Sequence, residues 1–178
     1  MESYTKRLSS LIQTENPIII GLSFGGMIAV ELSKLLKGHF LLISTAKTYI
    51  EIPFRYRLAG KLKLHKFLPS SFLRKPQWIT YYLFGVVTRD ARKLLREILR
   101  DTDLQFSQWA INQILNWKNL NLPESYIHVH GTEDRLLPNG NAQIYIEEAG
   151  HLMILTHSSQ INKIIDDFLL SVNSSSKQ

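Results

Sequence analysis

The chain has 178 residues, of which 44% are hydrophobic, and these values are typical of a single globular domain with a sizeable core. It contains no cysteine, which excludes disulfide bonds, thiolate metal sites and a cysteine nucleophile. No apolar run approaches the ~20 residues that a membrane span needs, so we expect no stable membrane insertion. The lack of cysteine and of a recognisable signal peptide favours a cytoplasmic location.

The first part of the chain alternates between helical and strand patterns. Apolar residues at helical spacing predict a helix over residues 3–13. Residues 17–22 form a short, β-branched and largely apolar run, which is typical of a parallel strand covered on both faces. A helix is predicted over residues 24–37, and a second buried strand over residues 39–44.

The middle of the chain, residues 51–122, differs in composition and charge. Its pattern is helical throughout, and it holds 13 Lys/Arg against 5 Asp/Glu, whereas the whole chain has a net charge of +6. Such a basic segment can attract nucleic acid, anionic lipid or an acidic substrate, but a solvated helical face is the simpler interpretation. Because no nucleic-acid-binding motif accompanies it, we expect no nucleic-acid partner.

Strand patterns return at residues 126–130 and 142–146, and the last helix is predicted from about residue 158, with a clear apolar stripe. A serine-rich tail, residues 173–178, is expected to be disordered. This order predicts an α/β fold with a mostly parallel sheet. Its discontinuous core comprises residues 1–50 and 123–172, and residues 51–122 form a helical insertion.

A nucleophile motif stands where the first strand meets the next helix. Gly21 to Gly25 read Gly-Leu-Ser-Phe-Gly, which fits the G-x-S-x-G nucleophile elbow. In this motif the serine occupies a sharp, strained turn, so nothing bulky is expected two residues to either side. We therefore predict that Ser23 is a nucleophile exposed at the amino end of a helix, where the helix dipole favours negative charge. A plain glycine turn is the alternative.

A serine nucleophile needs a base, and the base needs a carboxylate to orient it. In folds that carry this elbow, the acid and then the histidine follow the serine along the chain. Asp134 lies on a loop after a predicted strand and is the favoured acid, with Glu133 as the neighbouring alternative; a turn-capping role for Asp134 also stays open. His151, which follows Gly150 after the next strand, is the predicted base.

Two further histidines, His128 and His130, alternate along a predicted strand and therefore share one face. Such a pair could suit a metal, but no carboxylate pattern supports a site, and buried structural histidines are the simpler interpretation. We expect neither a metal nor a cofactor.

Three segments resemble the α/β-hydrolase superfamily, and in particular its small bacterial members with a helical cap: Gly-Leu-Ser-Phe-Gly-Gly-Met, His-Gly-Thr-Glu-Asp-Arg-Leu-Leu-Pro and Glu-Ala-Gly-His-Leu-Met-Ile. The resemblance implies a catalytic triad of Ser23, Asp134 and His151. It makes the backbone N–H of Phe24 an oxyanion donor and residues 51–122 a cap over the pocket.

The resemblance implies a serine hydrolase acting on a small-molecule ester or thioester with a small apolar acyl group. Some of the aromatic residues in 51–122 are candidates for lining its pocket, namely Trp78, Tyr82, Phe84 and Trp109. Two alternatives stay open: a lyase or haloperoxidase-like reaction on the same triad, or a catalytically impaired fragment or binding module of the same fold.

The front of the chain departs from the family pattern. Members usually carry several strands before the nucleophile strand, and one of them leads to a loop with a second oxyanion donor, whereas only 22 residues precede Ser23. We therefore expect an N-terminally truncated member without that donor, and the loss of one such donor typically costs ~10²–10³ in rate. Residues 17–22 would then form an exposed edge strand, through which the chain could form a homodimer.

Overall fold

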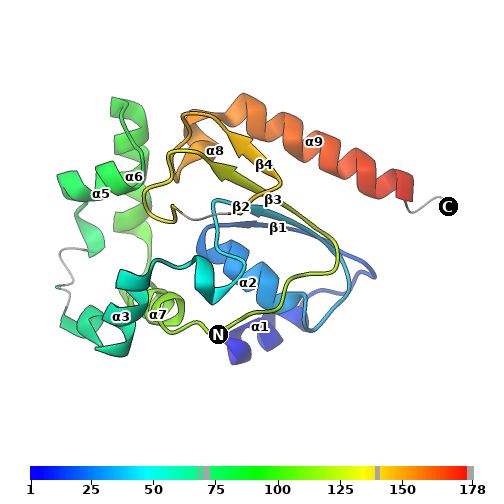
Figure 1. The fold of residues 1–178 in the computed structure, drawn as a ribbon, viewed down its shortest axis with the longest axis horizontal. Helices are drawn as coiled ribbons and strands as arrows, with labels where there is room; N and C mark the ends of the chain where they lie inside the picture. Colours follow the sequence, from blue (N-terminus) through cyan, green and yellow to red (C-terminus); the bar gives the residue numbers. More distant parts are fainter. Residues whose placement is uncertain (68, 70–72, 139–140, 176–178) are drawn as a thin grey trace.

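The computed structural model describes residues 1–67, 69, 73–138 and 141–175 (Figure 1). The elements of these residues follow in the order α1 (Glu2–Ser9), β1 (Ile18–Leu22), α2 (Phe24–Leu32), β2 (His39–Ile43), η1 (Tyr49–Glu51), α3 (Phe54–Lys61), η2 (Leu64–Phe67), α5 (Trp78–Leu83), α6 (Arg89–Asp101), α7 (Leu104–Leu115), β3 (Tyr126–Gly131), β4 (Ile144–Ile146), α8 (Met153–Thr156) and α9 (Ser158–Ser175).

The four strands form one parallel sheet in the order β1-β2-β3-β4, as the strand patterns predict. Helices α1 and α2 cover one face of the sheet, and α8 and α9 cover the other (Figure 1). Because both faces are covered, the strands are apolar on both sides, which accounts for their continuous hydrophobic runs.

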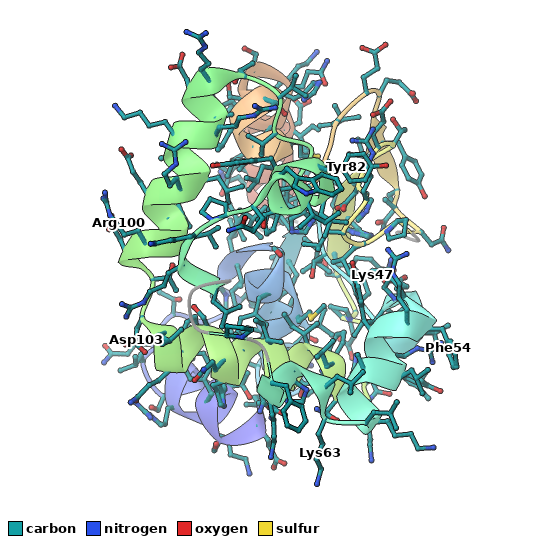
Figure 2. All side chains as sticks on the ribbon, turned by 90° about the vertical axis from the view of Figure 1, so that its left-hand side faces the viewer. Lys47, Phe54, Lys63, Tyr82, Arg100 and Asp103 are labelled. Carbon is teal, nitrogen blue, oxygen red and sulfur yellow. The ribbon has the colours of Figure 1, made fainter. Side chains whose placement is uncertain are left out.

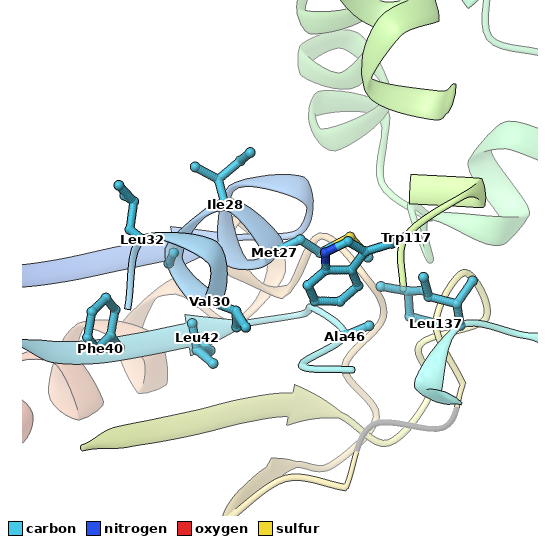
Figure 3. Packing of buried hydrophobic residues seen from close by; sticks show 11 residues of the cluster. Met27, Ile28, Val30, Leu32, Phe40, Leu42, Ala46, Trp117 and Leu137 are labelled. Atoms are coloured by element: carbon cyan, nitrogen blue, oxygen red, sulfur yellow. The ribbon is translucent and has the colours of Figure 1, made fainter. Parts of the chain in front are cut away.

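The core is divided by the sheet into two layers. Alternate residues of β2 point to opposite faces, so Phe40 and Leu42 pack with α2, whereas Leu41 and Ile43 pack with α8 and α9. On the α2 side, the indole of Trp117 packs close to Met27 and so ties the end of the helical insertion to the core (Figure 3).

The helical segment, residues 51–122, lies at one end of the sheet (Figure 1). Among its described residues there is no strand, and helices α3, α5, α6 and α7 make up most of it. Helix α3 packs so closely on α7 that a Cβ on Gly60 would lie 2.5 Å from the carbonyl oxygen of Leu115. The carboxyl end of β1 leads directly into Ser23, which places this serine at the same end of the sheet.

Several predicted boundaries are wrong in detail. Helix α2 ends at Leu32 rather than residue 37, since the next residues form tight turns such as Leu35 N–H to the Leu32 carbonyl at 2.9 Å. Strand β4 begins at Ile144 rather than residue 142, because the side chain of Gln143 accepts the His128 N–H at 2.8 Å.

The expectation of a disordered tail is also wrong for its first residues. Helix α9 continues to Ser175, and Val172 is buried against the second core layer, so packing extends this helix into the serine-rich stretch. Residues 176–178 lie outside the described residues.

Strand β1 lies at an edge of the sheet, as predicted, and pairs with β2. Ile18 and Ile19 pack on opposite core layers, but Ile20 is 46% exposed. This edge therefore carries some apolar surface, and the homodimer through it stays a prediction.

Candidate functional site

Ser23 lies in a strained turn between β1 and α2. Its φ of 51° is unusual for a residue other than glycine and costs roughly 1–3 kcal/mol. Two hydrogen bonds from the next strand hold it: the Ser23 N–H donates to the Ile43 carbonyl at 2.9 Å, and the Thr45 hydroxyl donates to the Ser23 carbonyl at 2.6 Å. The end of β2 therefore fixes the backbone that presents the Ser23 hydroxyl.

The glycines around Ser23 differ in what they do. A Cβ on Gly21 would lie 2.6 Å from the Gly25 carbonyl oxygen, so no larger residue fits there. A Cβ on Gly25, in contrast, would meet no atom within 4 Å, which contradicts the expectation of crowding on both sides. The crowded position is Gly26, where a Cβ would lie 2.5 Å from the side chain of Thr45. The close approach of α2 to β2 therefore depends on Gly26.

The three predicted catalytic side chains lie together. Ser23 Oγ is 2.7 Å from His151 Nε2, and His151 Nδ1 is 2.8 Å from Asp134 Oδ2. Because a carboxylate only accepts hydrogen bonds, His151 donates from Nδ1, and in the neutral ring Nε2 is left to accept the Ser23 hydroxyl proton. This is the tautomer that a general base acting on Ser23 needs.

Asp134 is buried, with 3% of its surface exposed, and its carboxylate is surrounded by donors. Oδ1 accepts the N–H groups of Leu136 and Leu137, both at 2.9 Å, while Oδ2 accepts from His151. Burial acts to raise the pKa of Asp134, but the hydrogen bond from His151 and the other nearby donors lower it below its usual value. The carboxylate is therefore held in its ionised form.

Glu133, the alternative acid, lies elsewhere. Its carboxylate pairs with Arg135 at 3.1 Å and is largely exposed. The structure thus brings Asp134, and not Glu133, to the His151 ring.

A second histidine lies beside the acid. His130 Nε2–H donates to the Leu137 carbonyl at 2.8 Å and lies 3.3 Å from Asp134 Oδ2. Burial lowers the pKa of His130 despite the opposing charge of Asp134, so the ring is neutral near pH 7. The neutral ring therefore lies beside the carboxylate, with its Nε2–H bonded to the Leu137 carbonyl.

A buried lysine, Lys47, lies next to His128. Lys47 Nζ donates to Glu51 at 2.7 Å, to Nδ1 of His128 at 3.0 Å and to the Asn141 carbonyl at 2.7 Å. Burial, followed by the charge of Lys47, lowers the pKa of His128 to about 3. His128 and His130 thus have protein partners, and the described residues hold no group of three or more His, Asp or Glu side chains placed for a metal.

Sequence reasoning missed Thr45, Lys47 and Glu51. Their only sequence signal is their place directly after a buried strand, where side chains reach the carboxyl end of a parallel sheet. Nothing in the spacing shows that Thr45 reaches the Ser23 carbonyl, because that contact depends on how β1 and β2 pair.

The helical segment touches the loop that carries His151. Gly85 has φ of 67°, and a Cβ on it would lie 2.8 Å from Cα of Gly150. The Leu152 N–H donates to the Phe84 carbonyl at 3.3 Å, and the Phe84 ring meets the His151 ring edge-on with centroids 5.4 Å apart. The orientation of His151 is therefore supported from the helical segment as well as from Asp134.

A cavity of about 530 Å³ opens beside Ser23. Apolar side chains such as Leu83, Phe84 and Ile114 dominate its described walls, which contain no lysine or arginine. The complete set is Ser23, Phe24, Met27, Tyr56, Ala59, Leu64, His65, Leu73, Ile79, Thr80, Leu83, Phe84, Leu99, Ile111, Ile114, Leu115, Leu136 and Leu137.

Of the four aromatic residues suggested for the pocket, Phe84 alone lines this cavity, and the other three suggestions are wrong for its described walls. Trp78 and Tyr82 lie at the surface, where the Arg135 guanidinium sits 4.5 Å from the Tyr82 ring centre. Trp109 packs against the Phe24 ring, 5.6 Å between centroids, and against α1. These side chains are used for packing and for surface contacts.

Phe24 is the first residue of α2, so its N–H has no partner within the helix and points out at the amino end beside Ser23. This places a donor next to the serine, and its role in an oxyanion hole stays a prediction. None of the helices in the described part of the chain combines the length and the apolar character needed to cross a membrane.

Comparisons with known proteins identify the fold and the family. Three solved structures share the fold. MenH from S. aureus has a TM-score of 0.67 and 15% identity, over 95% of this chain and 75% of that one. A meta-cleavage product hydrolase from Pseudomonas fluorescens IP01 has a TM-score of 0.60 and 18% identity, over 93% and 68%. An esterase from Exiguobacterium antarcticum has a TM-score of 0.58 and 16% identity, over 94% and 72%.

At these identities the three structures speak for the fold alone. Among curated proteins, no match to the sequence is found. The sequence itself matches the Alpha/beta hydrolase family over residues 2–163, which is most of its length. The chain therefore belongs to the alpha/beta hydrolase family.

Proposed function

We propose that the protein is a serine hydrolase that cleaves a carboxylic ester or thioester of a small apolar acid. The observation that carries the proposal is the series of hydrogen bonds from Ser23 through His151 to Asp134, with Ser23 lining the apolar cavity. Nucleophile, base and orienting acid are the groups that acyl transfer to a serine requires.

In the proposed reaction, Ser23 Oγ attacks the substrate carbonyl while its proton passes to His151 Nε2. The N–H of Phe24 donates to the carbonyl oxygen as it becomes negative. His151 then gives the proton to the departing alcohol or thiol, which leaves an acyl group on Ser23. A water molecule, activated by the same ring, hydrolyses this acyl-enzyme and restores the serine.

Each remaining group has a defined part. Asp134 stabilises the imidazolium that forms on His151, and its lowered pKa keeps it ionised for that purpose. The apolar walls contributed by residues 51–122 hold the acyl group, so this segment acts as a cap that selects the substrate.

The test combines a fluorophosphonate probe with hydrolysis of p-nitrophenyl butyrate. The wild-type chain should be labelled once, and Ser23→Ala should lose labelling and lower the hydrolysis rate about 10⁴-fold or more. Ser3→Ala, an exposed serine on α1, is the matched control and should behave as wild type. An unlabelled Ser23 in a folded chain that still binds apolar ligands would instead favour a binding module.

A further inference from the structure

The outer surface of the helical segment has an unusual composition along α3 and the residues that follow it. Five large apolar side chains are exposed there, and Phe54 and Phe67 are 69% and 82% exposed. We call this surface the α3–η2 face; its apolar members are Phe54, Leu58, Leu62, Leu64 and Phe67, and its exposed basic members are Arg55, Lys61, Lys63 and Lys66.

Helix α3 is oriented so that a row of large apolar side chains faces outward. Phe54, Leu58 and Leu62 are spaced four residues apart, so they lie along one side of the helix, and all three are exposed. The opposite side is committed to the interior, where Tyr56 and Ala59 line the cavity. Burial in the protein's own core therefore does not account for the outward apolar row.

The charge around this face has one sign. Residues 52–89 contain eight Lys/Arg and no Asp or Glu. Figure 2 shows Phe54 and Lys63 at the outer margin of this part of the molecule, projecting away from it. Glu51, which precedes this range, is mostly buried and paired with Lys47. Exposed aromatic and leucine side chains among lysines are the combination found in helices that lie in the interface of anionic membranes.

We propose that the α3–η2 face docks the protein onto an anionic lipid bilayer, with Phe54, Leu58 and Phe67 in the interface and the lysines among the headgroups. Lysine suits this position because its aliphatic stem lies along apolar surface while its ammonium group reaches phosphate. Each basic side chain near such a surface adds attraction, and the apolar side chains add the burial that charge alone does not provide.

The α3–η2 face adjoins the cavity, so docking on a membrane would also position the cavity. Leu64 lines the cavity and is also half-exposed on the α3–η2 face, so the face and a wall of the cavity share a residue. A docked molecule would therefore hold its apolar cavity next to the acyl chains of the membrane. Docking itself does not depend on the chemistry of Ser23, so a Ser23→Ala variant should bind membranes as the wild type does.

The test is co-sedimentation of the whole chain with vesicles of phosphatidylcholine containing 30% phosphatidylserine, and with vesicles of phosphatidylcholine alone. We expect binding to the first that weakens with added salt, and much weaker binding to the second. Replacing three lysines, Lys61→Gln, Lys63→Gln and Lys66→Gln, should weaken binding about fivefold per residue, the equivalent of about 1 kcal/mol each.

Removing apolar surface should act separately from charge. The double variant Phe54→Ser and Phe67→Ser should weaken binding at least tenfold and leave its salt dependence in place. Leu170→Ser and Lys163→Gln are matched controls, because both residues are exposed on α9, and they should bind as wild type. Circular dichroism checks that each variant is folded.

Three results would overturn the proposal. One is equal binding to charged and neutral vesicles, or none to either. Another is an equal loss of binding in the α9 controls. The third is a dimer in the absence of lipid that the Phe54 and Phe67 substitutions convert to monomer, which would make the face a contact between copies of the chain.

Discussion

The carboxyl end of the sheet and the helical segment above it are built in opposite ways. At the sheet, many polar groups are buried and hydrogen-bonded; Asp134 alone accepts three hydrogen bonds and has His130 close by. On the helical side, the cavity wall is almost entirely apolar, with Thr80 and His65 among its few polar residues. A bonded polar network fixes positions, whereas an apolar wall tolerates changes of shape. In the proposed function, the chemistry therefore belongs to the sheet and the choice of substrate to the helices.

The largest effect that would separate the two regions is expected at the acid. Asp134→Asn should lower kcat about 10³–10⁴-fold for p-nitrophenyl butyrate, because an amide no longer enforces the His151 tautomer or stabilises its charge. Glu133→Gln, one residue away and paired with Arg135, should change kcat less than about twofold. If the Glu133 change were the more damaging, the assignment of the acid would be wrong.

A second contrast concerns the two neighbouring glycines. Gly26→Ala places a methyl group against Thr45, which in turn holds the Ser23 carbonyl, so we expect a loss of about 3 kcal/mol in the free energy of unfolding. Gly25→Ala enters open space in the first turn of α2 and should change that free energy by less than about 1 kcal/mol. Urea titration of both variants measures the difference. Equal effects would contradict the close approach of α2 and β2.

Low pH should lower the free energy of unfolding through a buried histidine of the sheet region, His128. The pKa of His128 is about 3 in the folded chain and about 6.5 when unfolded, so the unfolded state binds more protons between these values. The free energy of unfolding should therefore fall as pH drops from about 6.5 toward 3, by at most about 1.4 kcal/mol per pH unit for this group. The lowered pKa of Asp134 adds a loss in the same direction only below about pH 4.

The variant that isolates this contribution is His128→Gln, whose amide oxygen can still accept from Lys47. Its stability should be flatter between pH 6 and pH 4 than that of the wild type, measured by urea titration at each pH. An unchanged slope would show that His128 is not kept neutral by its surroundings.

The smallest effect is expected in the apolar wall. Ile111→Phe narrows the cavity and should raise KM for long-chain p-nitrophenyl esters about tenfold relative to the butyrate, while labelling of Ser23 stays as in the wild type. Val87→Phe, on an exposed residue outside the described wall, is the control and should leave both unchanged. A loss of labelling in the Ile111 variant would show that the two regions are less separate than proposed.

Prediction from the sequence is most successful where the chain alternates between strand and helix. The order of the strands along the chain and the loops after them suffice to bring Ser23, Asp134 and His151 to one end of a parallel sheet. The nucleophile elbow can also be located from the sequence, because two glycines around a serine, between an apolar strand and a helix, are compatible with few other structures.

The failures have a common physical cause. Trp78, Tyr82 and Trp109 were assigned to the pocket by residue type, but the rotation of each helix decides which side chains face inward, and α5 and α7 carry apolar residues on more than one side. The contacts of Thr45 and Lys47 depend on strand pairing and on loops far along the chain. The local periodicity of the sequence carries no information about the rotation of these helices or about these long-range contacts.

The contact between Gly85 and Gly150 is the place where the backbones of the two regions meet most closely beside His151. At Gly85 the backbone after α5 packs directly against the backbone of the loop that carries His151, with no room for a side chain. The two segments therefore cannot move independently at this crossing. Any movement of α5 that widened the entrance for a bulky acyl chain would be transmitted to the imidazole, through the bonded pair Phe84 and Leu152. In the proposed reaction, admission of the substrate and alignment of His151 are therefore coupled. A helical segment exchanged for another would have to reproduce this crossing before it could change what the protein accepts.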